Sequence, residues 1–423
     1  MKERQLKMTI LDKRTNFKPF VYPWAYDAYK THEEMHWLPN EATSLPNDIG
    51  DYKNRLTHDE RSLITQILRF FTQTDIDVAN GYTKVYMPKF GHPELTMAMA
   101  SFAAREAVHI DAYSQVVETL GFGDDEYNKF MEYGEMRDKH EFLWDKPWEM
   151  PTSVTENIDG RIKMHIREPD KCIPLSIIVG GRDAGFTNEK IEEVFNLAYS
   201  LAKFSGFAEG LQLFSSFAIL MSFKKRGLMK GMGDIVTWSV RDESLHVETM
   251  AKVFKEIIKD YPWLNTPDFS NLIYKLAEEM VELENKFIDL AYRSDRLIPN
   301  VSTNTYSNNA VPISFNPYHC SNKMYEPITL EGLTKEEIKD FVKVTANERL
   351  VMLGFKKYFM DVDKNPIPWF NLMVAGEEHA NFFEGRGTAY AKGLNVSQLS
   401  FDDMDNFNTD MTDPMYDNLD IDE

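Results

Sequence analysis

Apolar residues recur at helical spacing through six long stretches of this chain. In each of them apolar side chains return every three or four positions, whereas few segments show the alternation typical of strands. The predicted helices span about 59–86, 93–120, 188–223, 233–259, 271–293 and 334–358. Because these helices are longer than most helices of globular proteins, they indicate one large all-α core built as a long-helix bundle.

The remaining sequence predicts attachments to that core. Two irregular stretches, near 124–187 and 297–330, look like insertions or surface connections, the first with some local helix. We therefore expect an N-terminal extension over 1–30, a main domain over 31–392 and a tail over 393–423. The tail is acidic, lacks basic residues and carries isolated apolar side chains, a pattern typical of segments that order on a partner.

Two of the predicted helices each contain the motif Glu-x-x-His. Glu106 and His109 form one copy, and Glu243 and His246 form the other. Residues three apart share a helix face, so each copy offers a carboxylate and an imidazole to one point. Bundles that bind two metal ions use two such motifs and one further carboxylate from each of two other helices. A third copy, at positions 33 and 36, precedes a proline that discourages helix, and we set Glu33 and His36 aside.

The two further carboxylates are sought on the helices without the motif. Asp75 and Asp77 point about 200° apart on a helix, and Asp75 is the one that shares a face with apolar neighbours. Glu209 is the only acid in a segment that is apolar almost all round, where a lone carboxylate is costly unless paired or metal-bound. The flanking Gly206 and Gly210 predict a locally distorted turn.

Charge supports the four acids as a set. Asp75, Glu106, Glu209 and Glu243 carry four negative charges, which two divalent cations would balance, and His109 and His246 would complete the shells. Taken alone, either Glu-x-x-His motif, and Asp75 likewise, is better explained as solvated helix surface. For Glu209 alone a functional role is the better explanation, because its neighbours are apolar. The metal hypothesis depends on four helices supplying the whole set.

Composition narrows the class of protein further. A net charge of -20 argues against general nucleic-acid binding. Two cysteines, Cys172 and Cys320, cannot form a disulfide framework and favour a reducing, cytoplasmic compartment. We find no signal peptide, no run of roughly 18 apolar residues for a membrane span, and no nucleotide-binding fingerprint.

Five strings of residues carry a resemblance to a known family. FFTQTD, REAVHIDAY, FAEGLQLF, RDESLH and NPIPWFN, within 37–390, resemble the radical-generating small subunit of class I ribonucleotide reductase, a ferritin-like protein. The resemblance implies that Asp75, Glu106 and His109 bind one metal ion. It implies that Glu209, Glu243 and His246 bind the other, with Glu106 and either Glu209 or Glu243 as bridges. Two iron ions are the expected cofactors, with manganese as the alternative.

The same resemblance implies roles for four more residues. Tyr113, on the helix face of Glu106 and His109, would be oxidised and store a radical. Asp242 and Trp37 would link His109 to a radical-transfer path, and Tyr416 in the tail would be the relay tyrosine, although it lies closer to the chain end than is usual in the family. For Tyr113 taken alone, a buried core tyrosine with a satisfied hydroxyl is the better explanation, and for Trp37 ordinary packing is an equally simple one.

The implied function is that of the small subunit of ribonucleoside-diphosphate reductase. Its partners would be the large catalytic subunit, docked through the tail, and a second copy of the chain, with no nucleic acid or membrane involved. A ferritin-like di-iron oxidase or hydroxylase and a non-catalytic iron-binding protein are the alternatives. Ser239 and Leu213 depart from the family, because bulky apolar or aromatic residues often wall the radical pocket at these two places.

Overall fold

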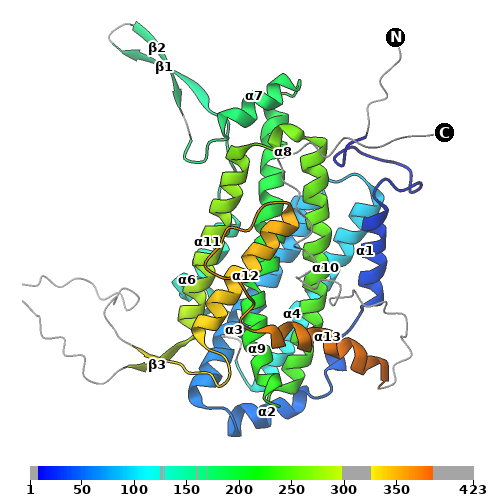
Figure 1. The fold of residues 1–423 in the computed structure, drawn as a ribbon, viewed down its shortest axis with the longest axis vertical. Coiled ribbons are helices and arrows are strands. Elements are labelled where there is room, and N and C mark those ends of the chain that lie inside the picture. The colour runs from blue at the N-terminus through cyan, green and yellow to red at the C-terminus, as the bar shows by residue number, and fades with distance from the viewer. Residues whose placement is uncertain are drawn as a thin grey trace, which may run out of the picture.

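A computed structural model describes residues 8–297 and 325–383, apart from 124–126, 128, 159, 160 and 168. The described chain is a bundle of long helices, which confirms the all-α prediction (Figure 1). Its main helices are α3 (His58–Asn80), α4 (Pro93–Leu120), α8 (Asn188–Leu201), α9 (Phe214–Lys225), α10 (Lys230–Asp260), α11 (Pro267–Ala291) and α12 (Lys335–Leu353). Tyr416, the whole predicted tail and most of 297–330 lie outside the described residues.

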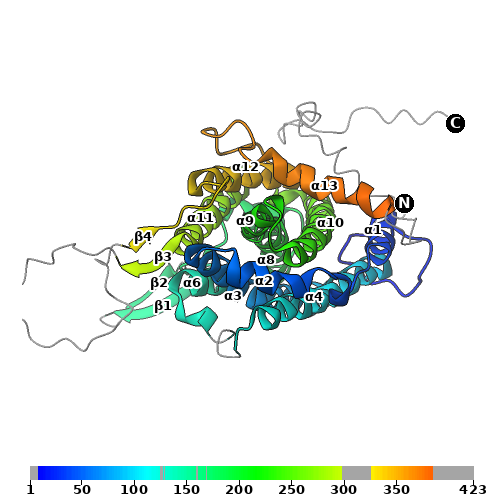
Figure 2. The ribbon, with the colours of Figure 1, turned by 90° about the horizontal axis from the view of Figure 1, so that it is seen from below.

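The helices pack in layers around a buried middle. Seen along the bundle, α8, α9 and α10 lie between α3 and α4 on one side and α11 and α12 on another (Figure 2). The core they enclose consists largely of aromatic and branched aliphatic side chains. Helices this long and this well covered gain most of their stability from packing of the apolar face.

Sequence signals define where several helices begin and end. Thr57 and Glu60 form a capping box at the start of α3, and Thr334 and Glu337 form another at the start of α12. Gly354, with a φ of 97°, ends α12 five residues before the predicted limit, because a left-handed residue cannot continue the helix. At the start of α10, the buried Asp48 carboxylate accepts the backbone N–H groups of residues 231 and 232.

The predicted distortion around residue 209 is confirmed. Residues Ala202–Gln212 form a π-helix between α8 and α9, and Gly81–Tyr86 form a second one after α3. The buried Arg349 of α12 donates from Nε to the Gly210 carbonyl oxygen over 2.7 Å. This bond satisfies a carbonyl group of the irregular segment from a neighbouring helix.

Several shorter elements were not predicted individually. They are α1 (Pro23–Glu34), α2 (Leu45–Asn54), α6 (Gly134–Leu143), α7 (Leu175–Asp183), α13 (Pro368–Phe383), the 3₁₀ turns Pro39–Glu41, Lys129–Glu132 and Pro262–Leu264, and four strands. The antiparallel pair β1 (Thr152–Ile158) and β2 (Arg161–Arg167) projects from the bundle near α7, and β3 (Arg293–Leu297) pairs with β4 (Tyr325–Pro327). Helix α1 packs along α4, so the expected N-terminal extension contributes to the bundle.

The prediction that no stretch is long and apolar enough to span a membrane is wrong for one helical segment. Asn188–Lys225 reaches that length and hydropathy. Its most apolar window is wholly buried inside the bundle, which is typical of the core helix of a large domain.

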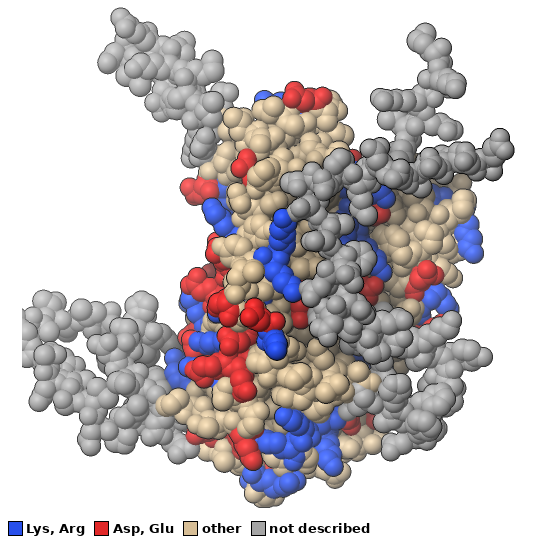
Figure 3. Space-filling model, in the orientation of Figure 1, with Lys and Arg blue, Asp and Glu red and all other residues tan. Residues whose placement is uncertain are grey.

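Charged side chains of both signs are interspersed on the face of α11 and α12 (Figure 3). Lys335 and Lys339 of α12, for example, both pair with Asp289 of α11. Exposed pairs of this kind contribute little to stability, so the fold depends on its core.

Candidate metal centre

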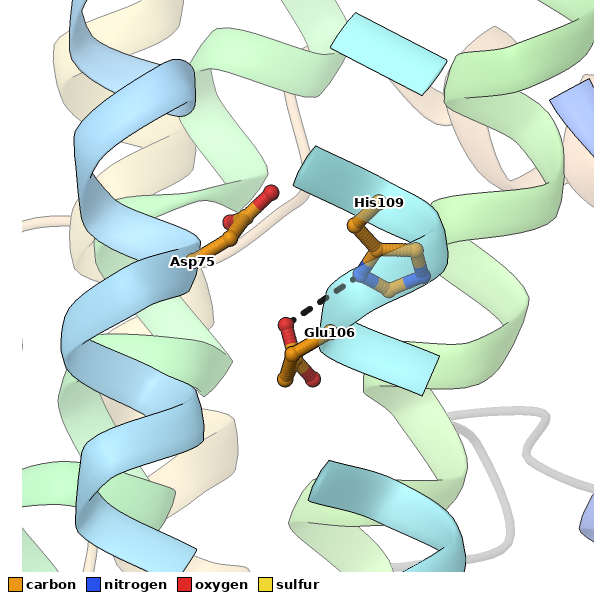
Figure 4. Close-up of side chains that lie close together, drawn as sticks. All are labelled: Asp75, Glu106 and His109. Atoms are coloured by element: carbon orange, nitrogen blue, oxygen red, sulfur yellow. Dashed lines mark ion pairs between the residues drawn. The ribbon is translucent and has the colours of Figure 1, made fainter. Parts of the chain in front are cut away.

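Side chains from three long helices converge at the centre of the bundle. Asp75 lies on α3, Glu106 and His109 lie on α4, and Glu243 and His246 lie on α10. All five are buried. Figure 4 shows the carboxylates of Asp75 and Glu106 and the ring of His109 around a common space.

Their ligand atoms form two groups that share Glu106. Asp75, Glu106 and His109 form one group, and Glu106, Glu243 and His246 form the other, each with its ligand atoms within 4.8 Å of one another. The helix spacing explains the pairing, because positions three apart on α4 and on α10 face the same point. The arrangement matches the ligand sets expected from the sequence, except for Glu209.

The two glutamates lie between the two histidines. Nδ1 of His109 is 3.3 Å from Glu106 Oε2 and 3.4 Å from Glu243 Oε1. Nδ1 of His246 is 3.3 Å from Glu106 Oε1 and 3.5 Å from Glu243 Oε2. Each glutamate thus presents one oxygen to each imidazole, which is the geometry of a bridging carboxylate. Of the two bridging alternatives left open by the sequence, this geometry favours Glu243 over Glu209.

Glu209 lies beside the cluster without joining either group of described residues. It projects from the π-helix, and its Oε2 accepts a hydrogen bond of 3.0 Å from the hydroxyl of Tyr82, a residue of the other π-helix. Burial raises the pKa of Glu209, and the Glu243 carboxylate raises it further. The Glu209 carboxyl group therefore interacts electrostatically with the cluster, but its hydrogen bond is to the Tyr82 hydroxyl.

The donor set fits a pair of metal ions. Asp75 Oδ2, both carboxylate oxygens of Glu106 and of Glu243, and Nδ1 of His246 are buried and make no hydrogen bond among the described residues, although the glutamates face the imidazoles in the long ion pairs given above. Leaving so many polar atoms unsatisfied is costly, and they are concentrated at one point. Carboxylate oxygen and imidazole nitrogen are ligands suited to iron and manganese. Bound cations would satisfy these atoms and balance their charge.

The pKa values of the cluster in the absence of metal also indicate a site that requires positive charge. Burial raises the pKa of Asp75, and the neighbouring Glu106 carboxylate raises it further. Burial alone would lower the pKa of His109, but the carboxylates of Glu106, Asp242 and Glu243 together outweigh it, and the pKa is raised. Without metal, protons therefore provide the positive charge that the acidic cluster requires.

The His109 ring is backed by a buried carboxylate. Its Nε2 lies 3.2 Å from Asp242 Oδ2, which also accepts a hydrogen bond of 2.7 Å from Trp37 Nε1. The Arg105 guanidinium pairs with Asp242 at 3.2 Å and donates to the backbone carbonyls of Met35 and His32. Arg105 was missed by the sequence analysis, although a basic residue beside a core glutamate was a usable signal.

The His246 ring is backed by a different chain of hydrogen-bonded groups, which begins with a neutral imidazole. Its Nε2 lies 3.1 Å from Nε2 of His32, and Nδ1 of His32 lies 2.7 Å from Ser101 Oγ. Ser101 in turn donates to Glu33 Oε1 over 2.5 Å. Burial lowers the pKa of His32 to about 2, so this ring is neutral. Glu33, set aside as a ligand, thus ends a chain from the cluster to the surface, while His36 is exposed and away from it.

Tyr113 is buried one turn beyond His109. Its hydroxyl donates a hydrogen bond of 3.0 Å to Ser239 Oγ, and its ring packs 4.7 Å from that of Phe71. Burial raises the pKa of Tyr113, and the Asp75 carboxylate raises it further, so the phenol keeps its proton. Leu213, the second departure from the family, is also buried.

Comparisons with known proteins agree with the geometry. A family model described as "Ribonucleotide reductase, small chain" matches residues 14–308. The chain is 38% identical over 390 residues to the probable ribonucleoside-diphosphate reductase small subunit 376L of Invertebrate iridescent virus 6, covering 91% of this chain and 96% of that protein. It is 26% identical to ribonucleoside-diphosphate reductase small chain 1 of Saccharomyces cerevisiae, covering 93% of this chain and 78% of that protein.

Solved structures share the fold. A putative class I ribonucleotide reductase from Bacillus halodurans superposes with a TM-score of 0.58 at 18% identity, covering 83% of this chain and 99% of that one. The dimanganese(II)-NrdF of Streptococcus sanguinis superposes with a TM-score of 0.57 at 16% identity, covering 86% and 99%. These likenesses confirm the ferritin-like class of the bundle.

Proposed function

The chain belongs to the ribonucleotide reductase small chain family, and from this premise we propose how its residues generate and store a radical. It is a small subunit of ribonucleoside-diphosphate reductase. The proposal is that the buried cluster binds two metal ions, that Tyr113 stores the oxidising equivalent, and that Asp242 and Trp37 pass it onward.

The observation that carries the proposal is the concentration of unsatisfied ligand atoms at one buried point. Asp75, Glu106 and His109 would hold one ion, and Glu243 and His246 would hold the other, and each of the two glutamates faces both imidazoles. Glu209 would join the second ion after giving up its hydrogen bond to the Tyr82 phenol. The π-helix that carries Glu209 supports a functional role for this residue, because π-helical segments are rare and occur frequently at functional sites.

The metal ions are proposed to be iron, with manganese as the alternative, since both accept mixed carboxylate and imidazole ligands. When bound, they would supply the reaction with dioxygen that makes an oxidant strong enough to oxidise a tyrosine. The protein contributes a site shielded from solvent, since the five cluster side chains on α3, α4 and α10 are buried.

Tyr113 would give up one electron and one proton together. Its raised pKa keeps the phenol protonated at neutral pH, so oxidation has to remove the proton as well. The Phe71 ring packs against Tyr113 and is itself backed by the Phe217 ring at 5.1 Å, so this side of the oxidised ring would be shielded from polar reactants. A buried and apolar neighbourhood is what long storage of a radical requires.

Asp242 and Trp37 would form the inner part of the exit path. Asp242 Oδ2 accepts from Trp37 Nε1 and lies at hydrogen-bond distance from His109, so one oxygen joins the metal ligand to the indole. The indole also stacks on the His109 ring at 5.8 Å between centroids. The outer part of the path would use Tyr416 in the acidic tail.

The partner of the tail would be the large catalytic subunit, in which ribonucleoside diphosphates are reduced to deoxyribonucleotides. We propose a homodimeric small subunit acting in the cytoplasm. Its relatives named above carry the corresponding reductase names, and the match covers 96% of the viral protein and 78% of the yeast protein.

Electron paramagnetic resonance after adding Fe(II) and oxygen to the metal-free protein tests the proposal. The parent should give a tyrosyl signal, and Tyr113→Phe should bind and oxidise the same amount of iron without that signal. Tyr86→Phe is the matched control, because Tyr86 is also a buried tyrosine of the bundle but its hydroxyl donates to the Ser200 carbonyl oxygen. Persistence of the same signal in Tyr113→Phe would overturn the assignment. A parent that oxidises iron without any radical would favour the oxidase alternative.

A further inference from the structure

Ser239 is the hydrogen-bond partner of the tyrosine proposed to carry the radical. It lies on α10, one turn before Glu243, and its Oγ accepts the Tyr113 hydroxyl at 3.0 Å. Both side chains are almost completely buried, with exposed fractions of 1% for Tyr113 and 0% for Ser239. A polar contact in so apolar a pocket is a strong one, because neither group has bulk water as an alternative.

The hydroxyl of Ser239 has a second partner that it can release. Its proton is donated to the Ile235 carbonyl oxygen, four residues earlier on the same helix, over 3.1 Å. That carbonyl lies inside α10 and accepts the regular helical N–H bond as well. A carbonyl oxygen has two lone pairs, so loss of the serine bond leaves it satisfied. Rotation about the Cβ–Oγ bond therefore leaves no buried group without a partner on the helix.

We propose that Ser239 is a switchable hydrogen-bond partner for Tyr113, accepting from the phenol and donating to the phenoxyl radical. The inference rests on the proposed function of Tyr113. In the oxidation, the phenolic O–H bond would break, and Tyr113 would lose its electron and its proton to the oxidant that bound metal ions would supply by reacting with dioxygen. No covalent bond to Ser239 forms, and the O–H bond of the serine stays intact. The phenoxyl oxygen can only accept, so the serine hydroxyl turns from Ile235 to Tyr113.

In this proposal the Tyr113 radical accepts a hydrogen bond from a side chain of the protein, the Ser239 hydroxyl. A serine at this position differs from the bulky apolar residue common in the family, and its hydroxyl is the feature that an apolar residue lacks. The hydrogen bond would stabilise the oxidised tyrosine in place and set its electronic structure. Ser239 thus contacts the reacting oxygen atom directly.

Two substitutions separate the hydroxyl from the volume of the side chain. Ser239→Ala removes the hydroxyl and reduces the volume, whereas Ser239→Val removes the hydroxyl and increases it. Ser244→Ala is the matched control, because the Ser244 hydroxyl also donates to the carbonyl four residues earlier on α10, at 2.7 Å.

The first measurement needs no metal. The ¹³C chemical shift of the Tyr113 ζ carbon, assigned by its loss in Tyr113→Phe, should change in both Ser239 variants and stay constant in Ser244→Ala. An unchanged shift in both Ser239 variants would show that the phenol is not bound to Ser239 and would overturn the inference. This result does not depend on whether the protein makes a radical.

The second measurement uses the iron-loaded protein after exchange into deuterium oxide. Electron–nuclear double resonance on the Tyr113 radical should show a strongly coupled exchangeable deuteron in the parent and in Ser244→Ala. The coupling should disappear in both Ser239 variants, and the largest g value should rise. A parent radical without this coupling would overturn the role of Ser239 while leaving radical storage intact. A parent without any radical would instead overturn the proposed function.

Discussion

The two histidines of the cluster are backed by different groups, which predicts that the two metal sites can be weakened separately. Asp242 contacts His109 at 3.2 Å, and His32 contacts His246 at 3.1 Å. We therefore expect Asp242→Asn to weaken the ion at His109 and His32→Leu to weaken the ion at His246. Loss of a group that orients a ligating imidazole typically lowers metal affinity about 10–100-fold, or about 1.4–2.8 kcal/mol.

The structure indicates that the Asp242 substitution has the larger effect. Its carboxylate receives donors from Trp37, His109 and Arg105, all buried. An asparagine offers one oxygen, leaves the guanidinium without a counter-charge and costs about 3–5 kcal/mol of folding stability as well. His32 is neutral, so its loss removes one hydrogen-bond acceptor at a smaller cost of about 1–3 kcal/mol. His32→Gln keeps an acceptor oxygen and should retain most of the affinity.

Stepwise Mn(II) titration of the metal-free variants measures the two dissociation constants, and anomalous scattering at the manganese edge locates the ion that remains. Asp242→Asn should keep the ion at His246, and His32→Leu should keep the ion at His109. Equal weakening of both ions by either variant, or no weakening by Asp242→Asn, would refute the reasoning from separate backing groups.

Three further changes have defined outcomes. Lys139→Met should lower the free energy of chemical unfolding by about 3–5 kcal/mol, because it leaves the buried Glu284, its partner at 2.6 Å, without a counter-charge. Lys139→Met combined with Glu284→Leu should be near neutral. Equal losses of stability in the two proteins would contradict the cost of the unpaired carboxylate. Trp37→Phe should leave the metal content and the tyrosyl signal unchanged but abolish nucleotide reduction with the large subunit, and retained turnover would exclude Trp37 from the path. Burial raises the pKa of Asp48 to about 6, above its ordinary 3.8, so the folded state binds this proton more tightly than the unfolded state. Ionisation of Asp48 therefore lowers the free energy of unfolding as the pH rises from about 4 to about 6. The stability of Asp48→Asn should vary less over that window, and identical pH profiles of the two proteins would contradict the raised pKa of Asp48.

The long helices and the pairing of the motifs were predictable because each depends on local periodicity. The positions 106 and 109 share a helix face in any α-helix, and the same holds for 243 and 246. The distorted turn at Glu209 was also predictable, since two glycines flank the only acid of an apolar segment. These signals need no knowledge of tertiary contacts.

The groups behind the ligands were not predictable in the same way. His32 comes from α1, and its contact with His246 on α10 depends on how α1 packs, a property without a sequence period. The motif that contains Glu33 was judged by its helix-breaking context as a poor ligand site, and nothing in its spacing indicated the contact with Ser101. The Tyr82 phenol on Glu209 likewise joins two π-helices that lie far apart in sequence.

The segment from α1 to Trp37 has a consequence for metal uptake. It supplies the His32 ring behind one metal ligand, the Trp37 indole on Asp242, and the Met35 carbonyl that receives Arg105. By thermodynamic linkage, any affinity that this docked segment adds to the metal centre must return as an equal strengthening of its own docking when metal binds. The N-terminal segment should therefore dock more tightly on the bundle when metal is bound. Its resistance to protease or to amide exchange should then report the metal occupancy of the centre.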